Sequence, residues 1–191
     1  MRAVDFGKSL LMKQAFTSCS SVSFSMIMGD LFCQQIVGDP LEWHRAFRMG
    51  ATGFLVAGPV SFSLHQIYER IAPGNAMRQI AKKLALTLFV TAPVHISATL
   101  TAATMLTPGK NAADAQEKVA SETIPTIINS IPYWGTVHAL NYRYTPVHNR
   151  PVLSSVAGVF WNIYFSWQAN KSGKENTWEP VMYSKANCSQ N

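Results

Sequence analysis

Long stretches without charged residues recur along the chain. Leu84–Gly109 contains no Asp, Glu, Lys or Arg over 26 residues, and 49–68, 123–142 and 151–170 are each uncharged over 20 residues. A helix that crosses a bilayer needs about 20 predominantly apolar residues. The pattern therefore leaves room for several membrane-spanning helices and predicts an all-α membrane protein.

We expect one membrane domain, 1–191, built as a bundle of four transmembrane helices. The predicted spans are approximately 14–37, 48–68, 84–107 and 151–169. The remaining uncharged stretch, 123–142, contains Pro125, Asn129, Pro132 and His138, and we do not interpret it as a fifth crossing. We therefore interpret 110–146 as a solvent-side helix followed by an additional interfacial helix between spans three and four. The segment 171–191 is expected to form a tail.

Small and polar side chains recur within the predicted spans at intervals of four residues, which places them on one face of a helix. In lipid, such residues are expected to point into the bundle. There they can let helices pack closely and bond to one another, or they can line a common wet path for small solutes. The candidates for lining or gating such a path are Asp30, Gln34, His65, Thr91, His95, Thr99, Gly158, Asn162 and Ser166.

Ionisable residues within the predicted spans add two further hypotheses. A carboxylate at bilayer depth pairs with a cation, meets water or serves an ion path, so Asp30 can either orient helices through an ion pair or select permeants. Its candidate partners near the span ends are Arg45, Arg48, Arg143 and Arg150. His65 and His95 carry imidazoles that titrate near neutral pH, so they can gate by pH or serve as hydrogen-bonded packing residues.

The charge balance narrows the classes of function. Lys and Arg together exceed Asp and Glu by 6, yet no run of basic residues suited to nucleic acid occurs, so we expect no nucleic-acid partner. Basic loops beside spans are typical of membrane topology and of contact with anionic lipid. The 3 cysteines form no C-x-x-C pair, and the chain contains no G-x-S-x-G, H-E-x-x-H or glycine-rich phosphate loop. We therefore expect no metal site, no cofactor and no enzymatic activity.

A specific motif lies between Trp134 and Trp167. Its first part reads WGTVHALNYRYTPVHNR and its end reads WNIYFSW. This block resembles the C-terminal half of the Mpv-seventeen/peroxisomal-membrane-protein family, which reads W-P-x-x-Q-x-x-N-F-x-x-V-P-x-x-x-R and then W-N-x-Y-L-S. The positions on this spacing are Trp134, Asn141, Tyr142, Pro146, Arg150, Trp161, Asn162, Tyr164 and Ser166. Arg143 lies among the aromatic residues, an arrangement typical of a membrane–water interface.

The N-terminal half resembles the same family independently. The family patterns G-D-x-x-x-Q and R-x-x-R-x-x-x-x-G-x-x-x-x-G-P are matched by Gly29, Asp30, Gln34, Arg45, Arg48, Gly53, Gly58 and Pro59. Glu42 stands where an Asp is usual, and Gly135 and His138 replace a Pro and a Gln in the C-terminal motif. The two halves match in the same order over about four-fifths of the chain.

The resemblance implies a small four-span protein of an organelle membrane. It implies a pore for small solutes and metabolites across the mitochondrial inner membrane, with the peroxisomal membrane as the alternative location. The expected partners are the lipid bilayer and small-molecule solutes, and formation of a homo-oligomer is left open. The alternative class of function is a non-conducting structural or adaptor membrane protein, in which the polar faces only pack or bind partners.

Overall fold

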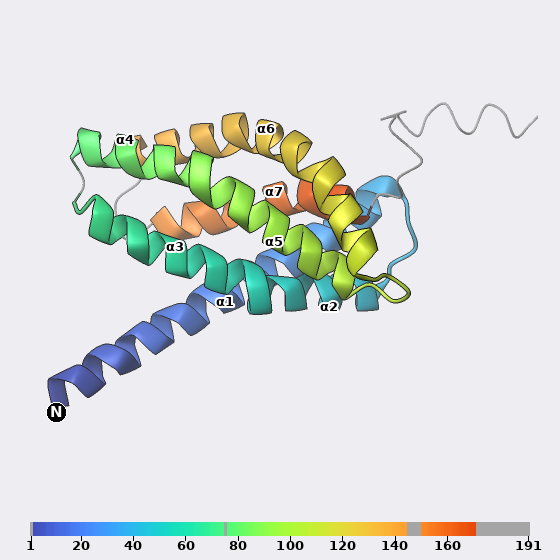
Figure 1. Ribbon diagram of the computed structural model, residues 1–191, viewed down its shortest axis with the longest axis horizontal. Coiled ribbons are helices and arrows are strands. Elements are labelled where there is room, and N and C mark those ends of the chain that lie inside the picture. Colours follow the sequence, from blue (N-terminus) through green and yellow to red (C-terminus); the bar gives the residue numbers. More distant parts are fainter. Residues whose placement is uncertain (1, 75, 145–149, 171–191) are drawn as a thin grey trace, which may run out of the picture.

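The computed structural model describes residues 2–74, 76–144 and 150–170, and this part of the chain is all helical, which confirms the predicted fold class (Figure 1). The side chains of residues 2–11, 65, 69, 139, 141–143, 150–152 and 155 lie outside the description. The elements are α1 (Arg2–Val37), α2 (Trp43–Thr52), η1 (Gly53–Ala57), α3 (Gly58–Ile71), α4 (Met77–Leu86), η2 (Thr87–Thr91), α5 (Ala92–Met105), α6 (Ala112–Tyr144) and α7 (Arg150–Asn170).

Two of the helices are interrupted by one turn of π-helix. The elements α2, η1 and α3 run on without a break, as do α4, η2 and α5, and each π turn precedes a proline, Pro59 or Pro93. A proline has no N–H and its ring crowds the carbonyl four residues before it. The wider turn accommodates this loss, because the N–H of Gly58 reaches the carbonyl of Gly53. Both interrupted helices have the same plan of 10 α, 5 π and 14 α residues.

Glycines in the left-handed region end two of the helices. Gly38 has φ 81° after α1, and its N–H bonds the carbonyl of Gln34 at 3.0 Å. Gly109 has φ 77° in the turn after α5. A residue with a Cβ is strained in this backbone conformation. These turns bring α2 back onto α1 and α6 back onto α5, so that neighbouring helices pack along their length (Figure 1).

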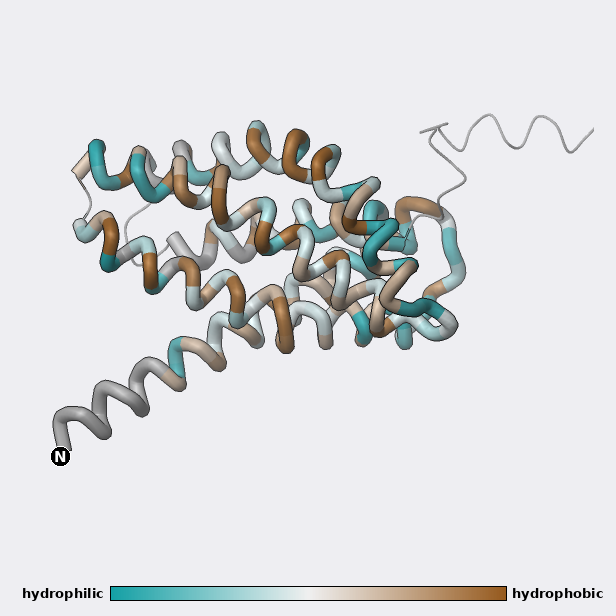
Figure 2. The backbone as a smooth tube through the Cα atoms, in the orientation of Figure 1, coloured by the Kyte–Doolittle hydropathy of each residue, from teal (hydrophilic) through white to brown (hydrophobic). Residues whose placement is uncertain are grey.

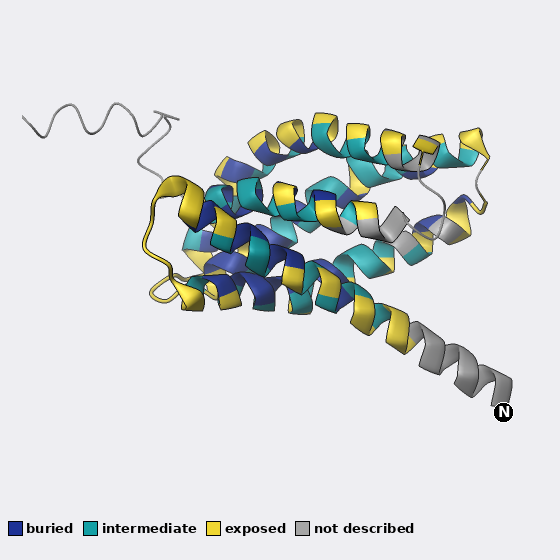
Figure 3. Ribbon diagram, turned by 180° about the vertical axis from the view of Figure 1, so that it is seen from behind, coloured by how far each residue is buried: buried dark blue, intermediate teal, exposed yellow. Residues whose placement is uncertain are grey.

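The interior contains both apolar and polar side chains, and many large apolar side chains lie on the outside. The interior contains an apolar core around Met26, Leu100, Trp161 and Phe165, but also Asp30, Gln34, Thr52, Thr99, Thr126 and Ser166, each at most 1 % exposed. Large apolar side chains such as Phe89 and Phe160 are exposed on the outside, and Figures 2 and 3 show the hydropathy and burial along each helix. Apolar side chains on the outside, together with polar groups that are bonded to one another inside, suit a bilayer.

One helix of the described residues, Met77–Met105, is long and apolar enough to cross a membrane by length and composition. Only 22 % of its most apolar 18 residues are buried inside the structure. This helix covers the third predicted span, 84–107. It begins earlier than predicted, because 77–83 contains no helix breaker and the buried Lys83 donates to the carbonyl of Gly74 at 3.1 Å.

The segment 110–146 differs from its interpretation as two separate helices. The structure has a single helix of 33 residues, α6, which contains both Pro125 and Pro132 and lies along α5 and α7 (Figure 1). A proline removes one backbone hydrogen bond, and packing against neighbouring helices compensates for this loss in a bundle. Glu122, expected on the solvent side, is 9 % exposed.

The start of α6 is fixed by a reciprocal cap outside the apolar region. The Asn111 side-chain oxygen accepts from the N–H groups of Ala113 and Asp114 at 2.8 and 3.1 Å, and Asp114 accepts from the N–H of Asn111 at 2.9 Å. This bond from Asn111, together with the bond from Lys110, lowers the pKa of Asp114. The folded protein therefore prefers the carboxylate form at this position.

We expect Asp114→Asn to lower the melting temperature at pH 7 and to have a smaller effect at about pH 2, below the ordinary pKa of a carboxyl. A carboxyl with a lowered pKa in the folded state contributes stability above its unfolded pKa, and this contribution is lost as the pH falls through the folded pKa. Thermal unfolding in detergent at both pH values measures the difference. Asn111→Ala is the matched control, because its loss of the other half of the cap persists at both pH values. A pH-independent effect of Asp114→Asn contradicts the assignment.

Candidate functional site

A buried carboxylate is held where α1, α2 and α7 meet. Asp30 on α1 has no exposed surface. Its side-chain oxygens accept from Arg45 Nε of α2 at 3.0 Å, from Gln34 Nε2 at 2.7 Å and from the hydroxyl of Ser166 on α7. Three donors from three helices therefore satisfy one charge inside the bundle, and we call Asp30, Gln34, Arg45 and Ser166 the Asp30 cluster.

The local sequence explains how these groups converge. Asp30 and Gln34 are four residues apart and share a face of α1. Gln34 also holds the turn into α2, because its Oε1 accepts from the N–H of Glu42 at 2.6 Å and its Nε2 lies 3.2 Å from the carbonyl of Glu42. This turn places Arg45, in the first turn of α2, directly beside Asp30.

The ion-pair partner of Asp30 is one of the four arginines considered from the sequence. Arg45 bonds Asp30 and also lies 3.2 Å from the exposed Asp39. Its Nη2 is 3.8 Å from Cys33 Sγ. Arg48 lines a separate surface pocket. The side chains of Arg143 and Arg150 lie outside the described residues.

The polar stripes of α1 and α7 face each other at close range. A Cβ on Gly29 would lie 2.5 Å from Asn162 Cβ and 2.7 Å from the Asn162 carbonyl carbon. Asn162 Nδ2 donates to Ser25 Oγ at 2.9 Å, and Gly158 faces the same serine. The contact between α1 and α7 therefore includes Gly158, Asn162 and Ser166. Small residues at such a contact are typical of packed membrane helices.

The candidates on the third predicted span form a second group. Thr91 Oγ1 donates to the hydroxyl of Tyr68 on α3 at 2.9 Å, and Tyr68 donates to the carbonyl of Leu86 at 3.2 Å. Thr99 is buried and bonds back to the carbonyl of His95, which is half-buried. His65 lies on α3 near this group, but its side chain is outside the described residues.

Most of the motif residues have a packing role in the described part of the chain. Gly53 and Gly58 touch α1, because a Cβ at either position would lie 2.9 Å from Ser23 Cα or 2.7 Å from Cys19 Cα. Trp161 contacts both Trp134 and Tyr164, with ring centroids 6.3 and 5.1 Å apart. The side chains of Asn141, Arg143 and Arg150, and all of Pro146, lie outside the description.

Sequence reasoning missed a second buried polar contact. The side-chain amide of Gln168 on α7 donates to the carboxylate of Glu122 on α6, and both side chains are buried. Glu122 was assigned to a solvent-side helix because of the charged residues around it. The available signal was Gln168, an amide inside an uncharged span, which requires a partner in lipid.

These features define a helical membrane bundle with a polar, partly ionised interior. The profile described as the Mpv17 / PMP22 family matches residues 104–166. The mitochondrial inner membrane protein Mpv17 of Xenopus laevis is 28 % identical over 151 residues, which cover 76 % of this chain and 84 % of the relative. The protein of the same name from Danio rerio is 28 % identical, with 75 % and 83 % covered. The Protein SYM1 of Mycosarcoma maydis is 28 % identical, with 72 % and 71 % covered.

The resemblance to the Mpv17 / PMP22 family that was drawn from the motifs is confirmed. Several relatives are named as mitochondrial inner membrane proteins, which agrees with the location predicted from the sequence and confirms it. No solved structure shows a significant match to the chain.

Proposed function

We propose that the protein provides a path for small solutes across the mitochondrial inner membrane, with the Asp30 cluster as the element that closes it. The observation that carries the proposal is the burial of the Asp30 carboxylate, paired with the part-buried Arg45, inside a bundle with many apolar side chains on its outer surface. Ionisable groups inside membrane bundles mark solute and ion pathways. In this conformation the charged groups are fully bonded to one another, which corresponds to a closed state.

The burial of polar side chains differs between parts of the bundle. Asp30, Gln34 and Ser166 are fully buried at the end where α1 and α7 finish. Four other polar side chains, on α3, α5, α6 and α7, are only half-buried: Ser61, His95, His138 and Ser154. Lys83 and Thr91 are buried. The half-buried polar groups support an interior that can admit water.

The membrane arrangement is part of the same proposal. Four crossings by α1, α2–α3, α4–α5 and α7 leave α6 as the helix between spans three and four. The outward-facing apolar residues of these four helices, among them Phe24, Leu55, Phe89 and Phe160, would face lipid. Ile124 and Ile128 give α6 an apolar outer face of its own, which suits contact with the bilayer.

The test of the path is the conductance of the purified full chain in planar bilayers. We expect discrete openings, and we expect Asp30→Asn to lengthen them, because the neutral amide no longer holds Arg45 across the interior. Asp39→Asn is the matched control: Asp39 contacts the same arginine but is exposed at the bundle end, so its conductance should equal that of the wild type. Absence of openings in both the wild type and Asp30→Asn, with the protein folded, rejects the path.

A structural or adaptor protein is the second candidate function, and the contact between Gly29 and Asn162 is the observation that favours it. Small residues at this contact serve helix packing. Asn162→Ala, which removes the bond to Ser25, separates the two functions. For a purely structural protein the substitution lowers stability by about 0.6 kcal/mol and there is no solute flux to change. For a path through the interior it also alters flux in liposomes.

A further inference from the structure

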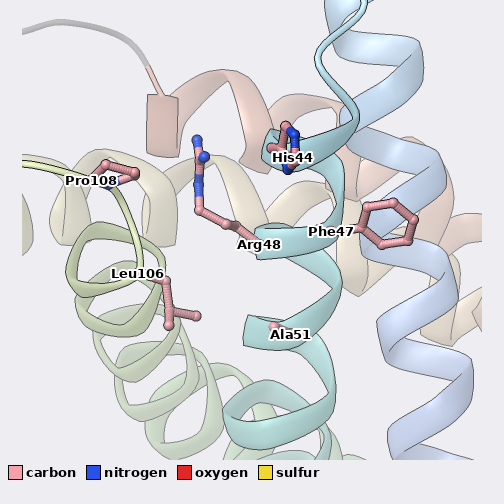
Figure 4. Close-up of a pocket in the computed structure, with 6 residues that line it drawn as sticks. All are labelled: His44, Phe47, Arg48, Ala51, Leu106 and Pro108. Atoms are coloured by element: carbon pink, nitrogen blue, oxygen red, sulfur yellow. The ribbon is translucent and has the colours of Figure 1, made fainter.

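A surface pocket of about 460 Å³ lies between α2 and the end of α5 (Figure 4). Pockets that bind small molecules span roughly 300–1,000 Å³. Four of its lining residues are apolar and two carry nitrogen donors. The lining residues are Phe47, Ala51, Leu106, Pro108, His44 and Arg48. The pocket therefore combines an apolar wall with a cationic group.

Arg48 differs from Arg45 in its charge partners. In the part of the chain that the structure describes, Arg45 pairs with two carboxylates, whereas no carboxylate pairs with Arg48. Figure 4 shows the Arg48 side chain pointing from α2 into the pocket, toward Pro108. A half-buried guanidinium beside apolar walls favours an anionic group, and its planar donors fit phosphate oxygens.

The pocket lies where the apolar surface of the bundle meets its polar end. Phe47 is 62 % exposed and Leu106 is 41 % exposed, so both present apolar surface outward. The loop that follows α5 carries the exposed residues Lys110 and Asn111. A molecule bound here would therefore have its polar part beside water and its apolar part beside the lipid-facing surface.

We propose that this pocket binds one anionic glycerophospholipid. The lipid phosphate lies on Arg48 and one acyl chain lies against Phe47 and Leu106. The apolar walls exclude a free inorganic anion as the preferred occupant. A zwitterionic lipid is disfavoured because its amine finds no carboxylate among the pocket residues. This inference concerns the lipid contact alone and holds whether or not the bundle conducts solutes.

Native mass spectrometry of the full chain in detergent tests the site, with dioleoyl phosphatidylglycerol, dioleoyl phosphatidylcholine and inorganic phosphate as separate probes. We expect one retained phosphatidylglycerol per chain. Arg48→Gln should weaken its binding by about tenfold or more, the ratio that corresponds to one charge-assisted hydrogen bond. Arg78→Gln is the matched control, because Arg78 is exposed at the first turn of α4, and it should leave binding unchanged.

Ala51→Phe is the second variant, because it fills the pocket and leaves Arg48 in place. It should also reduce retention of phosphatidylglycerol, and its folding is verified by its melting temperature. Equal retention of phosphatidylcholine overturns the proposal, as does binding of inorganic phosphate alone with the same dependence on Arg48. A mass of two chains that disappears in Arg48→Gln also overturns it, since the pocket would then hold a second copy.

Discussion

Replacement of Asp30 by leucine is expected to lower the free energy of unfolding by about 3–5 kcal/mol. The substitution leaves Arg45 without its buried partner and removes the acceptor of Gln34 and Ser166. An unpaired buried charge is costly, whereas replacement of both partners by apolar groups is often tolerated. The double variant Asp30→Leu/Arg45→Met should therefore be more stable than the sum of the two single effects predicts. Thermal unfolding of the detergent-solubilised protein measures all three.

Two controls isolate the ion pair. Arg48→Met should be additive with Asp30→Leu, because Arg48 lies in the surface pocket. Asp39→Asn should change stability by less than about 1 kcal/mol, because the Asp39 carboxylate is exposed. If the effects of Asp30→Leu and Arg45→Met are additive, the ion pair does not explain the stability of this region.

Replacement of Gly29 by alanine is expected to destabilise the bundle by about 1–3 kcal/mol, although only one methyl group is added. The new Cβ would lie 2.5 and 2.7 Å from Asn162 atoms, one of which belongs to the backbone of α7, so the two helices must separate. The separation also strains the neighbouring bond from Ser166 to Asp30. Thermal unfolding measures the loss.

Alanine substitutions at two other glycines provide a scale for the loss of stability that we expect at Gly29. Gly158→Ala should have a smaller effect, because the nearest atom is the single side-chain oxygen Ser25 Oγ at 3.1 Å. Gly135→Ala should be neutral or stabilising by up to about 1 kcal/mol, since no atom lies within 4 Å and alanine favours a helix. Equal losses at Gly29 and Gly135 would mean that close approach of α1 and α7 is not the cause.

The sequence predicted the helical fold and the burial of Asp30 from charge distribution and from the cost of a carboxylate in lipid. It could not distinguish Arg45 from Arg48, because both lie near the start of the second predicted span and only the turn held by Gln34 decides which one reaches Asp30. Nor could the sequence predict that Gly29 tolerates an added side chain less well than Gly158. The spacing of residues identifies a helix face but not the distance to the neighbouring helix.

The structure differs from the prediction for 110–146 in the continuity of the helix. Pro125 and Pro132 favour helix ends when the helix is considered alone, but α6 lies along α5 and α7 and remains continuous. The contact between Glu122 and Gln168 depends on that same packing, so it could not be derived from the local composition of either segment.

The two π-interrupted helices share one backbone plan but differ in what they contribute to the bundle. Trp43–Ile71 and Met77–Met105 divide into segments of equal length, place Pro59 and Pro93 at the same position, and run in opposite directions (Figure 1). At the equivalent position of each π turn, Ala57 packs in the apolar core, whereas Thr91 binds Tyr68 of the other helix. The same plan therefore supplies both a core element and the partner that holds it.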